Sequence, residues 1–131
     1  MTKLVHSMIR VLHEDVSVKF YRDTFGLEIV DRLDFDGFTL IYMALPKSAF
    51  ELELTINKDR KEPYDLGDGY GHIAVVVDDI EAARAKAVTA GATCGDIVDF
   101  RPGGDRVAQF FFVTDPDGYK IEVIQKGGRF A

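Results

Sequence analysis

The order of apolar and polar positions in the first half of the chain predicts one strand, one helix and three further strands. Residues 5–12 are rich in β-branched and apolar side chains, which is typical of a strand. Glu14-Asp15 then gives a helix-start signal, and Phe25-Gly26 marks the helix end because glycine adopts positive φ readily. The three further strands are predicted at residues 27–33, 38–45 and 50–57.

The second half of the chain repeats this order. Residues 72–77 predict a strand, Asp78-Asp79 begins a helix and Gly91 ends it. Later strands are predicted at residues 97–100, 107–113 and 119–125. Each half is therefore β-α-β-β-β, which indicates a duplicated unit. We predict an α+β fold of paired βαβββ modules that form a curved, largely antiparallel sheet. The whole chain, 1–131, is expected to be a single domain of two repeats, about 1–60 and 68–131.

Composition narrows the classes of partner. The chain has 131 residues, and its formal net charge of −6 argues against a nucleic-acid partner, which requires a basic face. No apolar run is long enough to span a membrane, and His6 and Arg10 interrupt any signal-peptide core. Cys94 is the one cysteine, so it forms no internal disulfide, and we expect it to be a small buried hydrophobe. These features predict a cytoplasmic protein that binds neither nucleic acid nor membranes.

Four residues recur at matching places in the two halves. His6 and His72 stand at the start of the first strand of their half, and Glu53 and Glu122 stand on its last strand. The separations from histidine to glutamate are similar, at 47 and 50 positions. Imidazole and carboxylate together suit a divalent transition ion such as Ni²⁺, Zn²⁺, Co²⁺ or Fe²⁺. The duplication therefore predicts one metal site of two histidines and two glutamates, with two octahedral positions left for water or substrate oxygens.

Each of these four residues, considered alone, could have an ordinary structural role instead of binding metal. A single histidine at a strand start is usually a satisfied surface or core residue, and a single glutamate usually marks the solvated face of a strand. Repetition weighs against that reading. Glu122 also lies between Ile121 and Val123 in an apolar strand, where a buried carboxylate needs a partner. Glu51, which aligns with Lys120, is interpreted as solvated.

At these residues the sequence resembles glyoxalase I, lactoylglutathione lyase, of the vicinal oxygen chelate superfamily. The phrase Asp115-Pro116-Asp117-Gly118-Tyr119-Lys120-Ile121-Glu122 is common across that superfamily and says little about activity. The combination of three others is much more specific: His6-Ser7-Met8-Ile9-Arg10-Val11, Glu53-Leu54-Thr55-Ile56-Asn57 and Tyr70-Gly71-His72-Ile73-Ala74. The resemblance spans nearly the whole chain in the family's order, and it implies the same paired βαβββ modules.

The resemblance implies a site and a reaction. His6, Glu53, His72 and Glu122 match the family's four metal ligands, while Arg10 and Asn57 match residues that contact the γ-glutamyl end of glutathione. The expected metal is Ni²⁺, with Zn²⁺ or Co²⁺ as alternatives. The expected partner is a second copy of the chain, in a homodimer whose active sites are shared.

The implied reaction isomerises the hemithioacetal of methylglyoxal and the cosubstrate glutathione to S-lactoylglutathione, by proton transfer through a metal-bound enediolate. Glu122 is the first choice as catalytic base and Glu53 the second. The chain would then be an enzyme, a carbon–sulfur lyase that detoxifies methylglyoxal.

The sequence departs from the family in two places. Lys58-Asp59 follows Asn57, where the family often has an aromatic residue, and residues 101–106 replace a compact Lys-Gly phrase that grips the glycyl carboxylate. Arg101 or Arg106 is a candidate to replace that lysine, and each is equally a candidate for a solvated loop charge. These departures bear on the thiol cosubstrate more than on the metal or the isomerisation.

Two other functions remain open from the sequence. One is another metalloenzyme on the same fold, namely an epimerase, a dioxygenase or a thiol transferase, although oxygenases and transferases there typically use two histidines and one glutamate. The other is a metal-free small-molecule binding protein of the bleomycin-resistance kind. The joint presence of all four candidate ligands weighs against the binding protein, and Glu53 beside His6 favours glyoxalase I.

Overall fold

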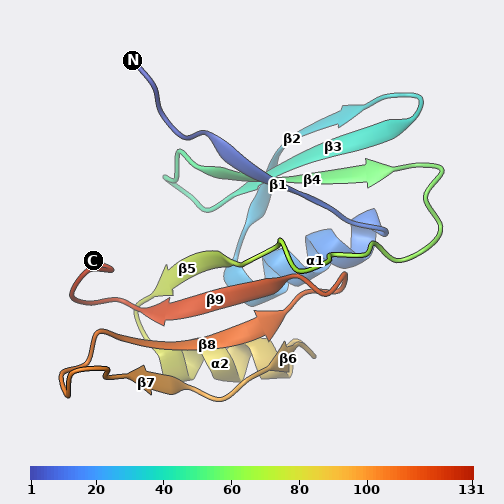
Figure 1. Cartoon of the computed structure of the whole chain (residues 1–131). Coiled ribbons are helices and arrows are strands. Elements are labelled where there is room, and N and C mark those ends of the chain that lie inside the picture. Colours follow the sequence, from blue (N-terminus) through green and yellow to red (C-terminus); the bar gives the residue numbers. More distant parts are fainter. The chain divides into compact units, whose positions relative to one another are not determined.

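The first half of the chain folds as a four-stranded sheet with one helix (Figure 1). Its elements are β1 (His6–Arg10), α1 (Glu14–Phe25), β2 (Glu28–Asp34), β3 (Phe38–Ala44) and β4 (Glu51–Asn57). The strand order is β1-β4-β3-β2. β1 runs parallel to β4, whereas β3 is antiparallel to both of its neighbours. This parallel contact places the first and last strands of the module side by side.

The second half builds the same sheet with one interruption. Its elements are β5 (Ile73–Val77), α2 (Ile80–Thr89), β6 (Thr93–Cys94), β7 (Val98–Phe100), β8 (Ala108–Thr114) and β9 (Lys120–Gln125). The order is β5-β9-β8-β6, and β7 also pairs with β8. The module's second strand is therefore split into β6 and β7. The two-residue β6 is too short to give a sequence signal and was not predicted. α2 packs against β6, β8 and β9 (Figure 1).

This computed structural model describes all 131 residues, which divide into two units, 1–65 and 66–131. Each unit holds one module with its own hydrogen-bonded sheet. The predicted α+β class with paired βαβββ modules is confirmed, and the strands are hydrogen-bonded as two mixed sheets, one in each unit. The two repeats as one domain stay a prediction. Neither helix is long and apolar enough to cross a membrane.

The end of α1 and the start of α2 follow the signals in the sequence. Gly26 caps α1 with φ of 79°, a left-handed conformation that suits glycine, and its N–H donates to the Arg22 carbonyl. The Asp79 side chain caps α2 by accepting a hydrogen bond from the Ala82 N–H at 3.1 Å. One end of each helix is therefore set by a residue that the sequence predicted.

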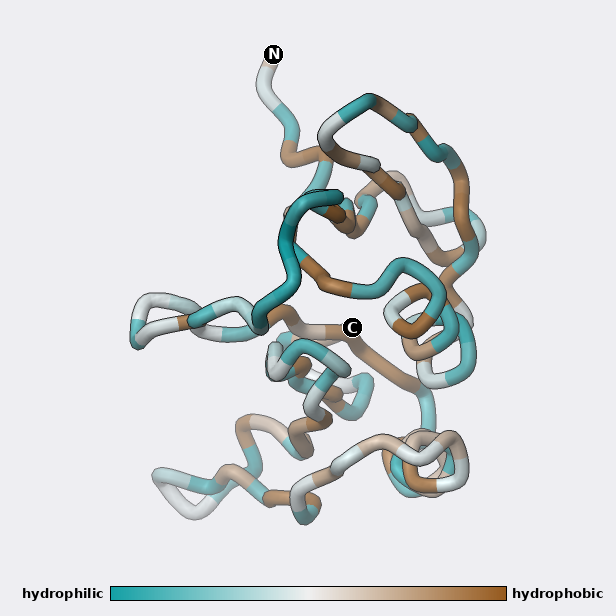
Figure 2. Tube along the Cα trace, turned by 90° about the vertical axis from the view of Figure 1, so that its right-hand side faces the viewer, coloured by the Kyte–Doolittle hydropathy of each residue, from teal (hydrophilic) through white to brown (hydrophobic).

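The alternation of side chains across each sheet separates the core from the candidate site. Ile41, Met43 and Leu54 are fully buried on one face of the first sheet, and residues such as Phe111 and Val113 repeat this pattern in the second. Figure 2 shows hydrophobic stretches recurring along the whole trace between hydrophilic ones. Because successive side chains point to opposite faces, Tyr42 and Phe112 lie on the faces away from these core residues. The candidate ligands share those faces.

Candidate metal centre and substrate pocket

The first candidate pair lies on neighbouring strands of unit 1. His6 opens β1, Glu53 lies on β4, and the parallel register sets Met8 opposite Glu53. The His6 imidazole thus reaches across to the carboxylate, with Nε2 and Oε1 separated by 3.0 Å. Glu53 is buried, at 8% relative exposure. The prediction that these two residues meet is consistent with this contact.

Tyr42 contacts both members of this pair. It pairs with Glu53 across β3 and β4, and its hydroxyl donates a hydrogen bond of 2.9 Å to Oε2. The His6 and Tyr42 rings also meet edge to face, with centroids 5.9 Å apart. The hydrogen bond to Glu53, followed by burial, raises the pKa of Tyr42 above its usual value. The phenol therefore remains protonated at neutral pH and acts as a donor.

The second candidate pair repeats this arrangement in unit 2. His72 immediately precedes β5 and Glu122 lies on β9, with Nε2 and Oε1 separated by 3.4 Å. The residue opposite Glu122 across β8 and β9 is Phe112. The His72 and Phe112 rings meet edge to face at 5.5 Å. This module therefore has the same histidine, glutamate and aromatic ring, but no hydroxyl on the ring.

The donor geometry of both pairs fits a divalent ion. Nitrogen and oxygen ligands lie about 2.1 Å from such an ion, so two of them are about 3.0 Å apart at a right angle and about 3.4 Å apart at the tetrahedral angle. The two observed separations agree with these values. A contact of 3.0 Å also fits an imidazole N–H that donates to the carboxylate.

The four candidate ligands occur as two pairs, one in each unit. The structure contains no group of three or more His, Cys, Asp and Glu residues that could hold an ion. Each unit contributes one imidazole nitrogen and one carboxylate to the predicted set. The meeting of His6, Glu53, His72 and Glu122 in one site stays a prediction.

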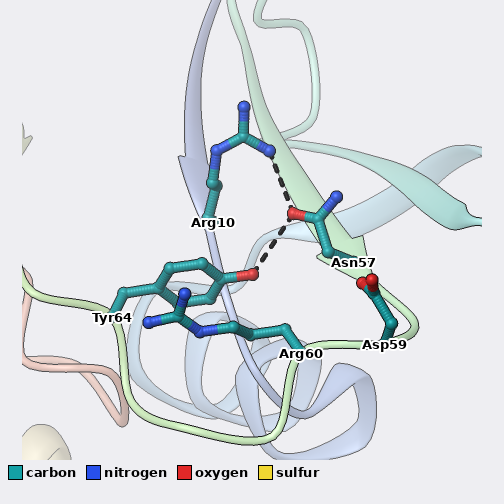
Figure 3. A pocket seen from close by; sticks show the side chains of 5 residues that line it. All are labelled: Arg10, Asn57, Asp59, Arg60 and Tyr64. Carbon is teal, nitrogen blue, oxygen red and sulfur yellow. Dashed lines mark hydrogen bonds between the residues drawn. The ribbon is translucent and has the colours of Figure 1, made fainter.

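The other two predicted site residues, Arg10 and Asn57, line a pocket at the ends of β1 and β4 (Figure 3). Arg10 donates a hydrogen bond of 3.0 Å to Oδ1 of Asn57, and the Tyr64 hydroxyl donates to the same oxygen at 3.2 Å. Two donors on Oδ1 fix the orientation of the amide, which leaves its Nδ2 group to donate to a ligand.

A loop that follows β4 supplies the rest of the pocket wall, namely Asp59, Arg60 and Tyr64. The Arg60 guanidinium lies over the Tyr64 ring, 4.4 Å from its centroid, and donates to the carbonyls of Glu62 and Pro63. Arg60 therefore organises this loop. The Asp59 carboxylate adds a negative charge to a pocket that Arg10 makes positive, so the pocket presents both signs of charge.

Arg101 and Arg106, the candidates for binding a glycyl carboxylate, both contact Asp99 on β7. Arg106 contacts the Asp99 carboxylate at 3.2 Å and Arg101 contacts it at 3.8 Å. Both side chains remain about half exposed. These contacts do not favour either arginine over the other.

Comparison with known proteins places the chain in a family. Residues 3–123 match the model of the Glyoxalase/Bleomycin resistance protein/Dioxygenase superfamily. The chain belongs to this superfamily. The paired βαβββ modules are the fold of its solved members, among them glyoxalase I from Leishmania major, described as trypanothione-dependent, which is 32% identical with a TM-score of 0.77. That likeness covers 95% of this chain and 87% of the other.

Within the superfamily, the chain is similar to lactoylglutathione lyases. It is 41% identical over 129 residues to the enzyme of Neisseria meningitidis serogroup B, covering 95% of this chain and 91% of the relative. It is 38% identical to that of Haemophilus influenzae, covering 94% and 92%. Glyoxalase I from Zea mays has a TM-score of 0.83 at 26% identity, over 96% of this chain and 45% of that one. The predicted resemblance to glyoxalase I is confirmed.

Four residues at these sites were not predicted from the sequence. Tyr42 was missed because its contact depends on the β3–β4 register, which the sequence does not state. The three loop residues Asp59, Arg60 and Tyr64 follow Asn57 without a recognisable motif. The one available signal was Lys58-Asp59 after Asn57, where the glyoxalase I family often has an aromatic residue.

Proposed function

We propose that this chain is a lactoylglutathione lyase, glyoxalase I, which converts the hemithioacetal of methylglyoxal and glutathione into S-lactoylglutathione. The observation that carries the proposal is the His–Glu pair built at the same place in both modules, at 3.0 and 3.4 Å. It occurs in a chain 41% identical to a lactoylglutathione lyase. A binding protein without a metal would have no use for this pair in both modules.

His6, Glu53, His72 and Glu122 would hold one divalent metal ion. Two imidazoles and two carboxylates form a borderline donor set, which suits several divalent transition ions. The resemblance to glyoxalase I makes Ni²⁺ the first choice, with Zn²⁺ or Co²⁺ as alternatives. When bound, the ion supplies Lewis acidity to the two neighbouring oxygens of the hemithioacetal. Each module contributes half of the ligands, so we propose that the site is completed between modules, in a homodimer with shared active sites.

The carboxylates carry the proton transfer. Glu122 removes the proton from the carbon that bears sulfur and returns it to the adjacent carbon, while the hydroxyl proton of the hemithioacetal passes to the neighbouring oxygen, so that the thioester forms with no net gain or loss of atoms. Glu122 is the first choice as base because its polar contact is with His72 alone, whereas Glu53 also accepts a hydrogen bond from Tyr42. Glu53 is the second choice.

The pocket beside β1 and β4 would hold the γ-glutamyl end of glutathione. That end carries an ammonium and a carboxylate, and the pocket offers Asp59 for the first and Arg10 for the second. The Nδ2 group of Asn57 is oriented as a further donor. The reaction uses the intracellular thiol glutathione, so we propose that the protein works in the cytoplasm.

Thioester formation from methylglyoxal and different thiols tests this proposal. Glutathione and γ-glutamylcysteine, which share the γ-glutamyl end, are expected to support turnover, whereas cysteinylglycine, which lacks that end, is expected to raise KM strongly. Absence of thioester with every thiol, from protein that binds metal tightly, would overturn the proposed reaction. Equal KM values for glutathione and cysteinylglycine would overturn only the assignment of the pocket.

A further inference from the structure

The two candidate metal pairs differ by a single hydroxyl group. Tyr42 lies opposite Glu53 across β3 and β4, and Phe112 lies opposite Glu122 across β8 and β9. These positions are equivalent in the two modules, and each ring meets its module's histidine edge to face. The ring alone is therefore sufficient for packing, because Phe112 packs in the same way. The Tyr42 hydroxyl needs a separate explanation.

The hydroxyl gives Glu53 a contact that Glu122 lacks. Oε1 of Glu53 faces His6, and Oε2 accepts the Tyr42 hydrogen bond of 2.9 Å, so both carboxylate oxygens are engaged. Glu122 contacts His72 through Oε1 at 3.4 Å, and no protein group donates to its Oε2. The Glu53 side chain is also less exposed, at 10% against 17% for Glu122. A hydrogen bond to a carboxylate is stronger than one between neutral groups, so Glu53 is held in one orientation.

We propose that Tyr42 is a positioning residue that holds Glu53 in place and thereby makes the two glutamates unequal. Glu53 then serves as the fixed ligand. Glu122 lies beside a phenyl ring, so its Oε2 accepts no hydrogen bond from the protein. Its side chain is then free enough to accept and return the substrate proton. This inference rests on the proposed function, and it assigns different roles to two residues that the duplicated fold would otherwise make equivalent. Removing a group that orients a metal ligand typically weakens metal affinity by about 10–100-fold.

Exchanging the two aromatic residues tests this role, first by metal binding without substrate and then by activity. Tyr42→Phe gives the first module the ring of the second, and it is expected to weaken Ni²⁺ binding about 10–100-fold in competition with a chromophoric chelator. It should also change the visible absorption spectrum of the Co²⁺-loaded protein, because the orientation of a ligand changes. Phe112→Tyr places the same donor opposite Glu122, and it is expected to tighten Ni²⁺ binding while lowering kcat.

Thr39→Val is the matched control. Thr39 is buried on the same strand, β3, and its hydroxyl donates to Asp34 at 2.7 Å, away from Glu53. This variant also loses a buried hydroxyl group, and it should lower thermal stability without altering the Ni²⁺ affinity or the Co²⁺ spectrum. A Ni²⁺ affinity and a Co²⁺ spectrum that are unchanged in Tyr42→Phe would overturn the proposal.

A double variant separates positioning from simple structural support. With saturating metal, Glu122→Gln leaves Glu53 as the remaining carboxylate. If Tyr42 restrains Glu53, adding Tyr42→Phe should increase the residual rate of thioester formation, although it weakens metal binding. A further decrease in that rate would contradict the proposal. If the wild-type chain forms no thioester at all, the proposed function fails, while the Ni²⁺ and Co²⁺ measurements still decide the role of Tyr42.

Discussion

The two modules keep one pair of residues in common and differ in the pair beside it. Both place a histidine at the start of the first strand against a glutamate on the last. Four positions after these residues, the first module has Arg10 and Asn57, hydrogen-bonded at 3.0 Å, whereas the second has Val76 on β5 and Lys126 just after β9. The duplicated residues are those that a shared metal needs from both sides. The residues that differ are those that would recognise one end of a substrate.

The largest expected effect is a difference in kcat between variants of the two glutamates. Glu122→Gln, refilled with Ni²⁺, should lower kcat by about 10²–10⁴-fold, since this range is typical for the loss of a general base. Glu53→Gln should lower kcat less once metal is saturating. Rates of thioester formation at saturating hemithioacetal and Ni²⁺ give the comparison. Full activity in Glu122→Gln with metal bound would show that another group is the base.

The next effect tests whether the two pairs hold one ion together. His6→Ala and His72→Ala should each weaken Ni²⁺ binding by at least about 100-fold, because each removes a ligand rather than a group that merely orients one. Neither variant should retain a tightly bound ion. Metal content after dialysis measures this directly. If either variant kept half of the wild-type metal, the pairs would be separate sites.

A smaller effect is expected where the modules differ. Arg10→Met should raise KM for the glutathione hemithioacetal by about 10–100-fold, the range for a lost hydrogen bond to a charged group. The equivalent change in the second module, Val76→Met, is the matched control and should leave KM unchanged. With cysteinylglycine as the thiol, Arg10→Met should have little effect. An equal loss with both thiols would place Arg10 outside γ-glutamyl recognition.

The smallest effect concerns Cys94, a half-buried residue of the second module that belongs to neither pair. Burial raises the pKa of the Cys94 thiol, so the reactive thiolate is scarcer at pH 7 than in a free cysteine. Iodoacetamide should therefore react with it more slowly than with glutathione, and the rate should rise as the pH approaches the raised pKa. Cys94→Ala should change thioester formation less than about 2-fold. Rapid alkylation at pH 7 would contradict this assignment.

The sequence predicted the repeated parts of the molecule better than the unique ones. The caps at Gly26 and Asp79 depend on local residues, and both were read correctly. The His–Glu pairs were found because duplication repeats their spacing. Tyr42 was not found, because its contact depends on which residue of β4 lies opposite it. The wall formed by Asp59, Arg60 and Tyr64 depends on how an irregular loop folds back, which no periodic pattern encodes.

The most direct test of the proposed function is a titration of chelator-stripped protein with Ni²⁺, and separately with Zn²⁺, while thioester formation from methylglyoxal and glutathione is followed. The proposed metal-dependent function predicts no activity without metal. It predicts a linear rise to a plateau at one ion per chain, with a higher plateau for Ni²⁺, because the two His–Glu pairs of a chain amount to the ligands of one site. Thioester formation in the stripped protein, or none with either metal despite tight binding, would contradict it.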